Sequence, residues 1–369
     1  MGSNVKLVLS LFVFATGMND VCGQPASWQD LVFDSLATRW DEAMPQGNGW
    51  LGALVWRKND KLRISLDRVD LWDDRPMPEI DQLKYKWVVE QVKKNEYDTV
   101  QRLGDWPYEK YPAPTKIPGA ALEFEMQYLG KVVANRLYIE NGWNEIRFEN
   151  DIVFNSYIHA VDNIGYFGIV LPVSLRKGNS FMTSLLPSLI VPTYHTGKDG
   201  ASGNSGEGQS LERLGYVQGE LIREGNSIRY HQPTWQNNFY EVLVQWEVIG
   251  DSSLIGRWTI SQNTPAVMPP FNAQEAEPTG WDRHIAWWKD YWSRSSVNIP
   301  DSLLLKQYYL EMYKFGCVAR SNTPPISLQA IWTADNGNLP PWKGDFHHDL
   351  NTQLSYWPGY ASNHTDLTS

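Results

Sequence analysis

One stretch near the C-terminal end of the sequence collects the side chains best suited to binding and cleaving a sugar. Between Pro324 and Gln353 it carries Trp332, Trp342, His347, His348, Asp349 and Asn351. An indole face can stack on the C–H face of a pyranose ring, and His, Asp and Asn side chains form directional hydrogen bonds with hydroxyl groups. The same residue types would also suit an aromatic core edge with solvated polar turns. Composition alone leaves both interpretations open.

Two proline pairs, Pro324-Pro325 and Pro340-Pro341, punctuate this stretch. A Pro-Pro pair fits neither a helix interior nor a central strand, so the pairs predict loops held in one conformation. Rigid loops of this kind could hold rings and carboxylates in fixed positions. We therefore expect Trp332 and Trp342 to be either sugar-stacking platforms or residues of the core.

The elements that must position this stretch begin with strands. From Trp28 to about Val267 the pattern is mostly β, with apolar and polar residues alternating over 122–128 and again over 242–248. Asn141-Gly142 lies between two apolar runs and predicts a hairpin, because both residue types tolerate the positive φ angles of a tight turn. This half of the chain is expected to be an antiparallel β-sandwich.

After the proline-containing stretch 265–278 the apolar period becomes helical. One helix is predicted by apolar residues at steps of four, three and four, namely Trp281, Ile285, Trp288 and Trp292. A second should begin after an N-cap at Asp301, with a stripe formed by Leu305, Tyr308, Met312, Phe315 and Ala319. We expect these rows to be packing faces, and a further helix is predicted within 350–360.

Composition restricts the class of partner. The formal net charge of the 369 residues is −10 and no basic run occurs, which argues against nucleic acid or an anionic membrane surface. The 18 Trp and 18 Tyr are unusually many and suit either an aromatic core or carbohydrate-binding surfaces. There is no glycine-rich phosphate loop, zinc-type cysteine pairing or spaced acidic cluster, so neither a cofactor nor a metal is expected.

The N-terminus has the pattern of an export signal. Lys6 precedes an apolar run, Leu7–Phe14, that is too short to span a bilayer, and Val21-Cys22-Gly23 offers a cleavage site before Gln24. A lipidated Cys22 is the alternative, in a poor sequence context. Cleavage after Gly23 would leave Cys317 as the only cysteine and exclude an internal disulfide. A periplasmic or secreted location is expected.

Three motifs in order resemble glycoside hydrolase family 95, the inverting α-L-fucosidases and their α-L-galactosidase relatives. They are the opening segment Trp40–Ala53, the run Leu328–Trp332, and the run His347–Pro358. The resemblance implies a multidomain α+β protein with residues 1–23 as signal peptide, 24–270 as an antiparallel β-super-sandwich, 271–300 as a helical linker and 301–369 as the beginning of an (α/α)6 barrel. A double ring of twelve helices needs well over about 150 residues, so the barrel is expected to be incomplete here.

The family's His-x-Asn-x-Asn motif falls on His347, Asp349 and Asn351. The resemblance implies that His347 contacts the sugar. It also implies that the side chains at 349 and 351 position a water together with an aspartate from later in the barrel, and that the general acid is a glutamate that also lies later in the barrel. Asp349 departs from the family's Asn. Inversion needs an acid and a base whose carboxyl groups are roughly 6.5–9.5 Å apart. An amide only orients water, whereas a carboxylate also takes its proton. Asp349 is therefore a candidate base, alone or as one member of a coupled carboxylate pair, or an orienting group. The alternative is a buried structural residue held by Lys343 or by backbone amides near a helix start.

The leading hypothesis is an exported hydrolase that cleaves terminal α-L-fucosyl or related residues from oligo- or polysaccharides, with the fragment inactive alone. His348 is a weaker sugar ligand than His347, because adjacent residues on a regular element point apart. A family 65-like glycoside phosphorylase is a second hypothesis, which a carboxylate at 349 disfavours by repelling phosphate. A third is a non-catalytic carbohydrate-binding or scaffold protein. The oligomeric state is not predicted.

Overall fold

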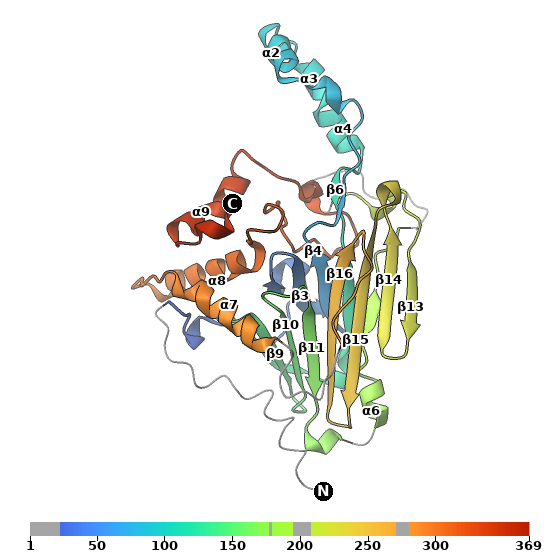
Figure 1. Ribbon diagram of the computed structural model, residues 1–369, viewed down its shortest axis with the longest axis vertical. Helices are drawn as coiled ribbons and strands as arrows, with labels where there is room; N and C mark the ends of the chain where they lie inside the picture. Colours follow the sequence, from blue (N-terminus) through green and yellow to red (C-terminus); the bar gives the residue numbers. More distant parts are fainter. Residues whose placement is uncertain (1–22, 177–178, 195–207, 271–279, 369) are drawn as a thin grey trace.

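The computed structural model describes residues 23–176, 179–194, 208–270 and 280–368. The predicted signal peptide up to Cys22, and most of the Gly/Ser-rich segment 196–210, lie outside them. Two antiparallel sheets dominate the described part (Figure 1). The larger sheet contains, in spatial order, β1 Leu31–Phe33, β8 Val132–Tyr138, β9 Trp143–Phe148, β10 Val153–Ile158, β11 Gly165–Val170, β16 Ser253–Gln262, β15 Phe239–Ile249, β14 Ser227–Pro233 and β13 Glu220–Glu224.

The smaller sheet contains β12 Ser188–Ile190, β7 Ala120–Glu125, β4 Lys61–Arg68, β3 Leu51–Lys58 and β2 Met44–Gly47. A separate two-stranded sheet pairs β5 Trp72–Asp73 with β6 Thr115–Lys116. The helices are α2 Tyr85–Lys93, α3 Tyr97–Leu103, α4 Asp105–Lys110, α5 Met126–Leu129, α6 Asn179–Thr183, α7 Trp281–Ser293, α8 Ser302–Val318 and α9 Asn351–Ala361.

The two large sheets face each other across one apolar core. Phe124 of β7 contacts Phe154 of β10 and Phe167 of β11 edge to face, with ring centroids 5.2 and 5.4 Å apart. Along β4, Leu62, Ile64 and Leu66 enter this core. The residues between them therefore point to the opposite, outer face of the smaller sheet, because successive strand side chains alternate. The fold is a β-sandwich with an added helical part, as the alternation and the change of period predict.

The hairpin prediction is confirmed, since β8 and β9 pair around a turn in which Gly142 has a φ of 70°. The strand predicted over 122–128 is too long. It ends at Glu125, and Met126–Leu129 forms α5. Met126 and Leu129 are three residues apart, so one helical turn brings both onto the core, whereas in a continued strand they would point to opposite faces.

A helical arm interrupts the segment expected to be mostly β. It consists of α2, α3 and α4, lies between β5 and β6, and projects from the end of the sheets (Figure 1). Many of its aromatic side chains face solvent; Tyr85 is 86% exposed and Trp106 is 63% exposed. Few of its residues enter the main core, so its position depends on contacts at its base.

The predicted helices α7, α8 and α9 are present and gather on one side of the strands (Figure 1). Asp301 caps α8 by accepting hydrogen bonds from the backbone of Leu303 and Leu304 at 2.9 and 3.1 Å. Within α7, Trp288 and Trp292 are buried, together with His284, which the apolar period did not mark. In the part of the chain that the structure describes, no helix is both long and apolar enough to cross a bilayer.

Candidate functional site

The chemistry-bearing stretch follows α8 as a long connection, residues 319–350, here called the motif loop. All of it is described, and it contains the 3-10 helix η7 Pro341–Gly344 but no α-helix. This agrees with the loops predicted from the two Pro-Pro pairs. The loop has two parts with different surroundings: residues 326–338 lie against the smaller sheet, and residues 340–350 lie between the helical arm and α9.

The first part packs directly onto the outer face of β2 and β3. A Cβ atom on Gly52 would lie 1.9 Å from the carbonyl oxygen of Ile331, and one on Gly47 would lie 2.2 Å from the Ile331 side chain. Only glycine permits so close an approach between two backbones. The Trp332 indole N–H donates to the carbonyl of Gln46 at 2.9 Å. The motifs Trp40–Ala53 and Leu328–Trp332, far apart in sequence, therefore pack directly against each other.

An ion network holds the loop to β4. Arg63 donates from Nε and Nη2 to the two carboxylate oxygens of Asp335 at 2.5 and 2.8 Å, and from Nη1 to Glu123 at 2.5 Å. Ser65 adds a hydrogen bond of 2.6 Å to Asp335. Burial alone would raise the pKa of Asp335, but the Arg63 guanidinium outweighs it and holds that pKa below its ordinary value. This bidentate pair fixes the loop's position along the strand.

A second buried pair lies beside the first. Lys116 contacts both carboxylate oxygens of Asp67 at 3.0 and 2.9 Å, and the backbone N–H of Thr333 donates to Asp67 at 2.9 Å. The Thr333 hydroxyl donates to the same oxygen. Burial raises the pKa of Asp67, against the opposing effect of Lys116. Its oxygens are occupied by structural donors, so this carboxyl group is not available to a substrate.

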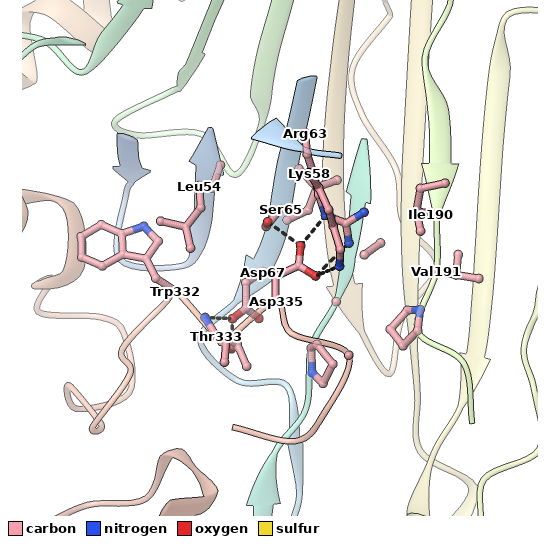
Figure 2. Close-up of a pocket in the computed structure, with 18 of the residues that line it drawn as sticks. Leu54, Lys58, Arg63, Ser65, Asp67, Ile190, Val191, Trp332, Thr333 and Asp335 are labelled. Atoms are coloured by element: carbon pink, nitrogen blue, oxygen red, sulfur yellow. Dashed lines mark hydrogen bonds and ion pairs between the residues drawn. The ribbon is translucent and has the colours of Figure 1, made fainter. Parts of the chain in front are cut away.

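These contacts leave a cavity of about 410 Å³ between the loop and the smaller sheet (Figure 2). Trp332, Leu54, Ile190 and Val191 supply apolar walls, and the Arg63–Asp335 network lies at its polar side (Figure 2). The structure therefore separates Trp332 from the other predicted site residues. Its ring is partly buried and tied to the sheet, which favours the packing role over the platform role.

The second part of the loop turns sharply at η7. Trp342, Lys343 and Gly344 all have left-handed backbone conformations, with φ of 56°, 58° and 62°. Trp342 is left 45% exposed while Lys343 is buried. The Lys343 ammonium donates to the carbonyl of Tyr111 at 2.8 Å, and desolvation lowers the pKa of Lys343 to about 8. Lys343 thus anchors the loop to the base of the arm, which excludes the alternative that it holds Asp349.

His347 is the best-positioned of the predicted sugar ligands. Its Nε2 lies 2.6 Å from Oδ1 of Asp345, and the Tyr108 hydroxyl of α4 donates to Oδ2 of the same carboxylate at 3.0 Å. The ring of Trp342 meets that of His347 at 81°, with centroids 6.2 Å apart. An exposed indole and an imidazole therefore share one corner of the surface, beside the arm.

The remaining predicted residues follow at the start of α9. Phe346 stacks on Trp72 of β5 and on His348, with centroids 5.9 and 6.1 Å away. Asp349 and Asn351 are both exposed, and the Asp349 carboxylate has no hydrogen bond to the described residues. The alternative of a buried structural aspartate is therefore excluded. Asn351 is the first residue of α9, so both side chains lie at a helix N-terminus.

Residues 284–369 match the family model of the glycosyl hydrolase family 95 catalytic domain. This part of the chain belongs to glycoside hydrolase family 95. The matched range starts within α7 and contains α8, the motif loop and α9, hence all six predicted site residues. It identifies a portion of a glycoside hydrolase whose substrate is a carbohydrate. No curated protein matches the chain.

Two residues of this candidate site were not predicted from the sequence. Asp345 lies two residues before His347, and its only signal was its place inside the motif. Tyr108 gave no signal, because it lies in the arm, 237 residues away from Asp345 in sequence. Within the described ranges, no group of three or more His, Cys, Asp or Glu side chains could hold a metal ion.

Proposed function

We propose that this chain is the N-terminal part of an exported, inverting glycoside hydrolase that removes terminal α-L-fucosyl or related residues from oligo- or polysaccharides. The observation that carries the proposal is the corner formed by Trp342 and His347, followed two residues along the chain by an exposed Asp349. The corner supplies an aromatic face and a hydrogen-bonding ring, and the neighbouring chain supplies an exposed carboxylate; sugar recognition and water activation use these three groups. It also lies inside the range matched to the family.

Each side chain has a distinct role in this proposal. Trp342 supports the apolar face of the sugar, and His347 hydrogen-bonds a hydroxyl group. Asp349 takes a proton from the attacking water or orients it, while the Asn351 amide only orients it. The resemblance assigns the general acid to a glutamate later in the barrel.

We propose further that α8 and α9 are the first helices of an (α/α)6 barrel. Both expose large apolar side chains: Leu303 is 75% exposed, Leu354 46% and Trp357 57%. Helices of a bundle or a double ring cover such faces with neighbouring helices. Residues 1–23 are proposed to direct export, which N-terminal sequencing of the exported protein would test by a start at Gln24.

Sugar binding by the 369-residue chain tests the site. Titration with L-fucose and with L-galactose, followed by ligand-observed NMR, should show binding that Trp342→Ala and His347→Gln each weaken. Trp332→Phe is the matched control, because it keeps a ring against the sheet and leaves the corner intact. Equal losses in Trp332→Phe and Trp342→Ala, or no binding by the wild type, would refute this placement of the site.

Hydrolysis separates the proposal from a purely binding protein. The 369-residue chain should not turn over an aryl α-L-fucoside, because leaving-group protonation contributes about two to four powers of ten and the proposed acid lies outside these residues. A fusion carrying the remaining barrel should release β-L-fucose, the inverted anomer. Retained configuration, or binding without hydrolysis in the fusion, would contradict the proposed reaction.

A further inference from the structure

The cavity on the outer face of the smaller sheet takes no part in the proposed reaction. It is bounded by β3, β4 and β7, by the end of β12 and by residues 331–338 of the motif loop (Figure 2). None of Trp342, His347 and Asp349 is among the residues that line it. Its volume of about 410 Å³ lies within the range of sites that bind small molecules. The cavity therefore shares no residue with the corner and has room for a ligand.

The walls of the cavity are held in place by the contacts between the loop and the sheet. Arg63 binds Asp335 of the loop to β4, and Asp67 binds the backbone of Thr333 to the same strand. Ile331 meets the backbone of β3 directly. Protein interiors are otherwise close-packed, with few voids larger than a water molecule. The cavity is thus preformed, as most small-molecule sites are.

Two polar side chains at the cavity have unused hydrogen-bonding capacity. The Lys58 ammonium lies 3.6 Å from Oδ1 of Asp335, too far for a hydrogen bond. The Glu212 carboxylate has no hydrogen bond or ion pair with any residue that the structure describes. Of its two oxygens Oε2 is buried, so Oε1 is the acceptor that a ligand can reach. The cavity therefore offers one donor group and one acceptor group.

The charges around the cavity disfavour an anionic ligand. Apart from Glu212, each charged residue of the lining belongs to an ion pair. The pairs are Lys58 and Arg63 with Asp335, Arg63 with Glu123, Lys61 with Glu125, and Lys116 with Asp67. These pairs contain as many carboxylates as cations, so one unbalanced negative charge remains, at Glu212. A phosphate, sulfate or uronate would be repelled there, whereas an uncharged ligand would not.

We propose that this cavity is a carbohydrate site additional to the corner, and that it binds one uncharged sugar unit on the β-sandwich. Each sugar hydroxyl both donates and accepts, so hydroxyl groups can use Lys58 and Glu212 together. The C–H groups of the ring then face the apolar wall formed by Leu54, Ile190 and Val191. The assignment uses no residue of the corner, so its failure would leave the proposed function intact.

Methyl NMR of the 369-residue chain, labelled at the isoleucine δ1 groups, observes this cavity directly. Ile190 is 37% exposed at the rim and is the reporter, assigned through Ile190→Val; Ile222, 43% exposed in β13, is the reference. At least one of D-glucose, D-galactose and L-fucose should shift the Ile190 signal and leave that of Ile222 in place. D-galacturonate should bind roughly tenfold more weakly than D-galactose. No shift with any of the three neutral sugars would overturn the proposal.

Variants of Glu212 test the class of ligand. Glu212→Ala should raise the Kd for the neutral sugar roughly two- to tenfold, the effect of losing one hydrogen bond. Glu212→Gln keeps an acceptor oxygen without the charge, so its Kd should stay within about twofold of the wild type. Binding of D-galactosamine alone, abolished in Glu212→Gln, would identify a site for cations and overturn the assignment to uncharged sugars.

A cavity-filling variant tests the place of binding. Val191→Phe puts a ring into the cavity from a partly buried position and should abolish the sugar-induced shift of Ile190. Val217→Phe makes the same change at a side chain that is 69% exposed and outside the cavity, and should preserve the shift. Unchanged binding in both Val191→Phe and Glu212→Ala would overturn the placement of the site.

Discussion

The contact between α7 and the sandwich should make the protein acid-sensitive through one buried histidine. His284 is fully buried; its Nδ1 accepts a hydrogen bond from the backbone of Ala160 at 3.0 Å, and its Nε2 donates to the carbonyl of Asn141 at 2.8 Å. Protonation would turn the acceptor into a donor facing the Ala160 N–H. Desolvation, and next the neighbouring His159, lower the pKa of His284 from 6.5 to about 3.

The sign and size of the effect follow from linkage. The unfolded chain binds a proton at His284 below pH 6.5 and the folded chain does not until about pH 3, so stability is complete above pH 6.5 and falls as pH decreases between these values. One pKa unit corresponds to about 1.4 kcal/mol, so the free energy of unfolding should drop by about 2 kcal/mol between pH 7.5 and pH 5 from this residue.

Urea unfolding of the 369-residue chain, followed by tryptophan fluorescence at pH 7.5 and pH 5, measures this drop. His284→Gln keeps an N–H that can reach Asn141 and cannot be protonated in this range. The variant should be less stable at pH 7.5 but lose about 2 kcal/mol less than the wild type at pH 5. His348→Gln, the same change at an exposed position, should follow the wild-type profile. Parallel pH profiles for the wild type and His284→Gln would refute the reasoning.

Three other perturbations have defined outcomes. Asp335→Asn leaves the Arg63 guanidinium short of a charged partner and should lower the free energy of unfolding by about 3 kcal/mol in urea titrations, whereas loss below 1 kcal/mol would mean that the network does not hold the loop. Asp301→Ala removes the cap of α8 and should cost about 1 kcal/mol in the same assay, with Asp301→Asn close to neutral. In the barrel-containing fusion, Asp349→Asn should lower kcat by about two to four powers of ten with little change in KM, if Asp349 is the base. A near-wild-type rate would instead reduce Asp349 to an orienting group.

Local sequence patterns predicted the elements whose residues interact with near neighbours in the chain. Asp301 and the apolar stripe after it predicted α8, and Asn141-Gly142 predicted the β8–β9 hairpin, because caps, stripes and tight turns are decided within a few residues. The helical arm was not predicted, because its residues give no comparable local signal. Its three helices have nine, seven and six residues, each shorter than the window of about 11–18 residues over which helical periodicity is read, and Gln91 is their one buried residue.

The sequence located the segment that carries the candidate site, but it did not predict how the side chains of that segment are placed and which residues they contact. Trp332 and Trp342 carry the same compositional signal, yet the indole N–H of the first is bonded to Gln46 while the second faces solvent. Three successive left-handed residues at η7 and the contacts of the loop with β4 and the arm produce this difference. Pairings over such sequence distances leave no local period, so the roles of Asp345 and Tyr108 appear only in three dimensions.

The contact between Arg63 and Asp335 also bears on how the polypeptide is made. The two residues are 272 positions apart, so β4 leaves the ribosome long before its partner is synthesised. At about 5–20 residues per second, the gap lasts roughly 14 to 54 s. Throughout that interval the outer face of the smaller sheet, with Arg63 and the Asp67–Lys116 pair, has no cover from the motif loop. The nascent chain therefore passes through a stage in which these charges remain hydrated, and completion of the sandwich surface waits for translation of the segment that carries the proposed sugar site.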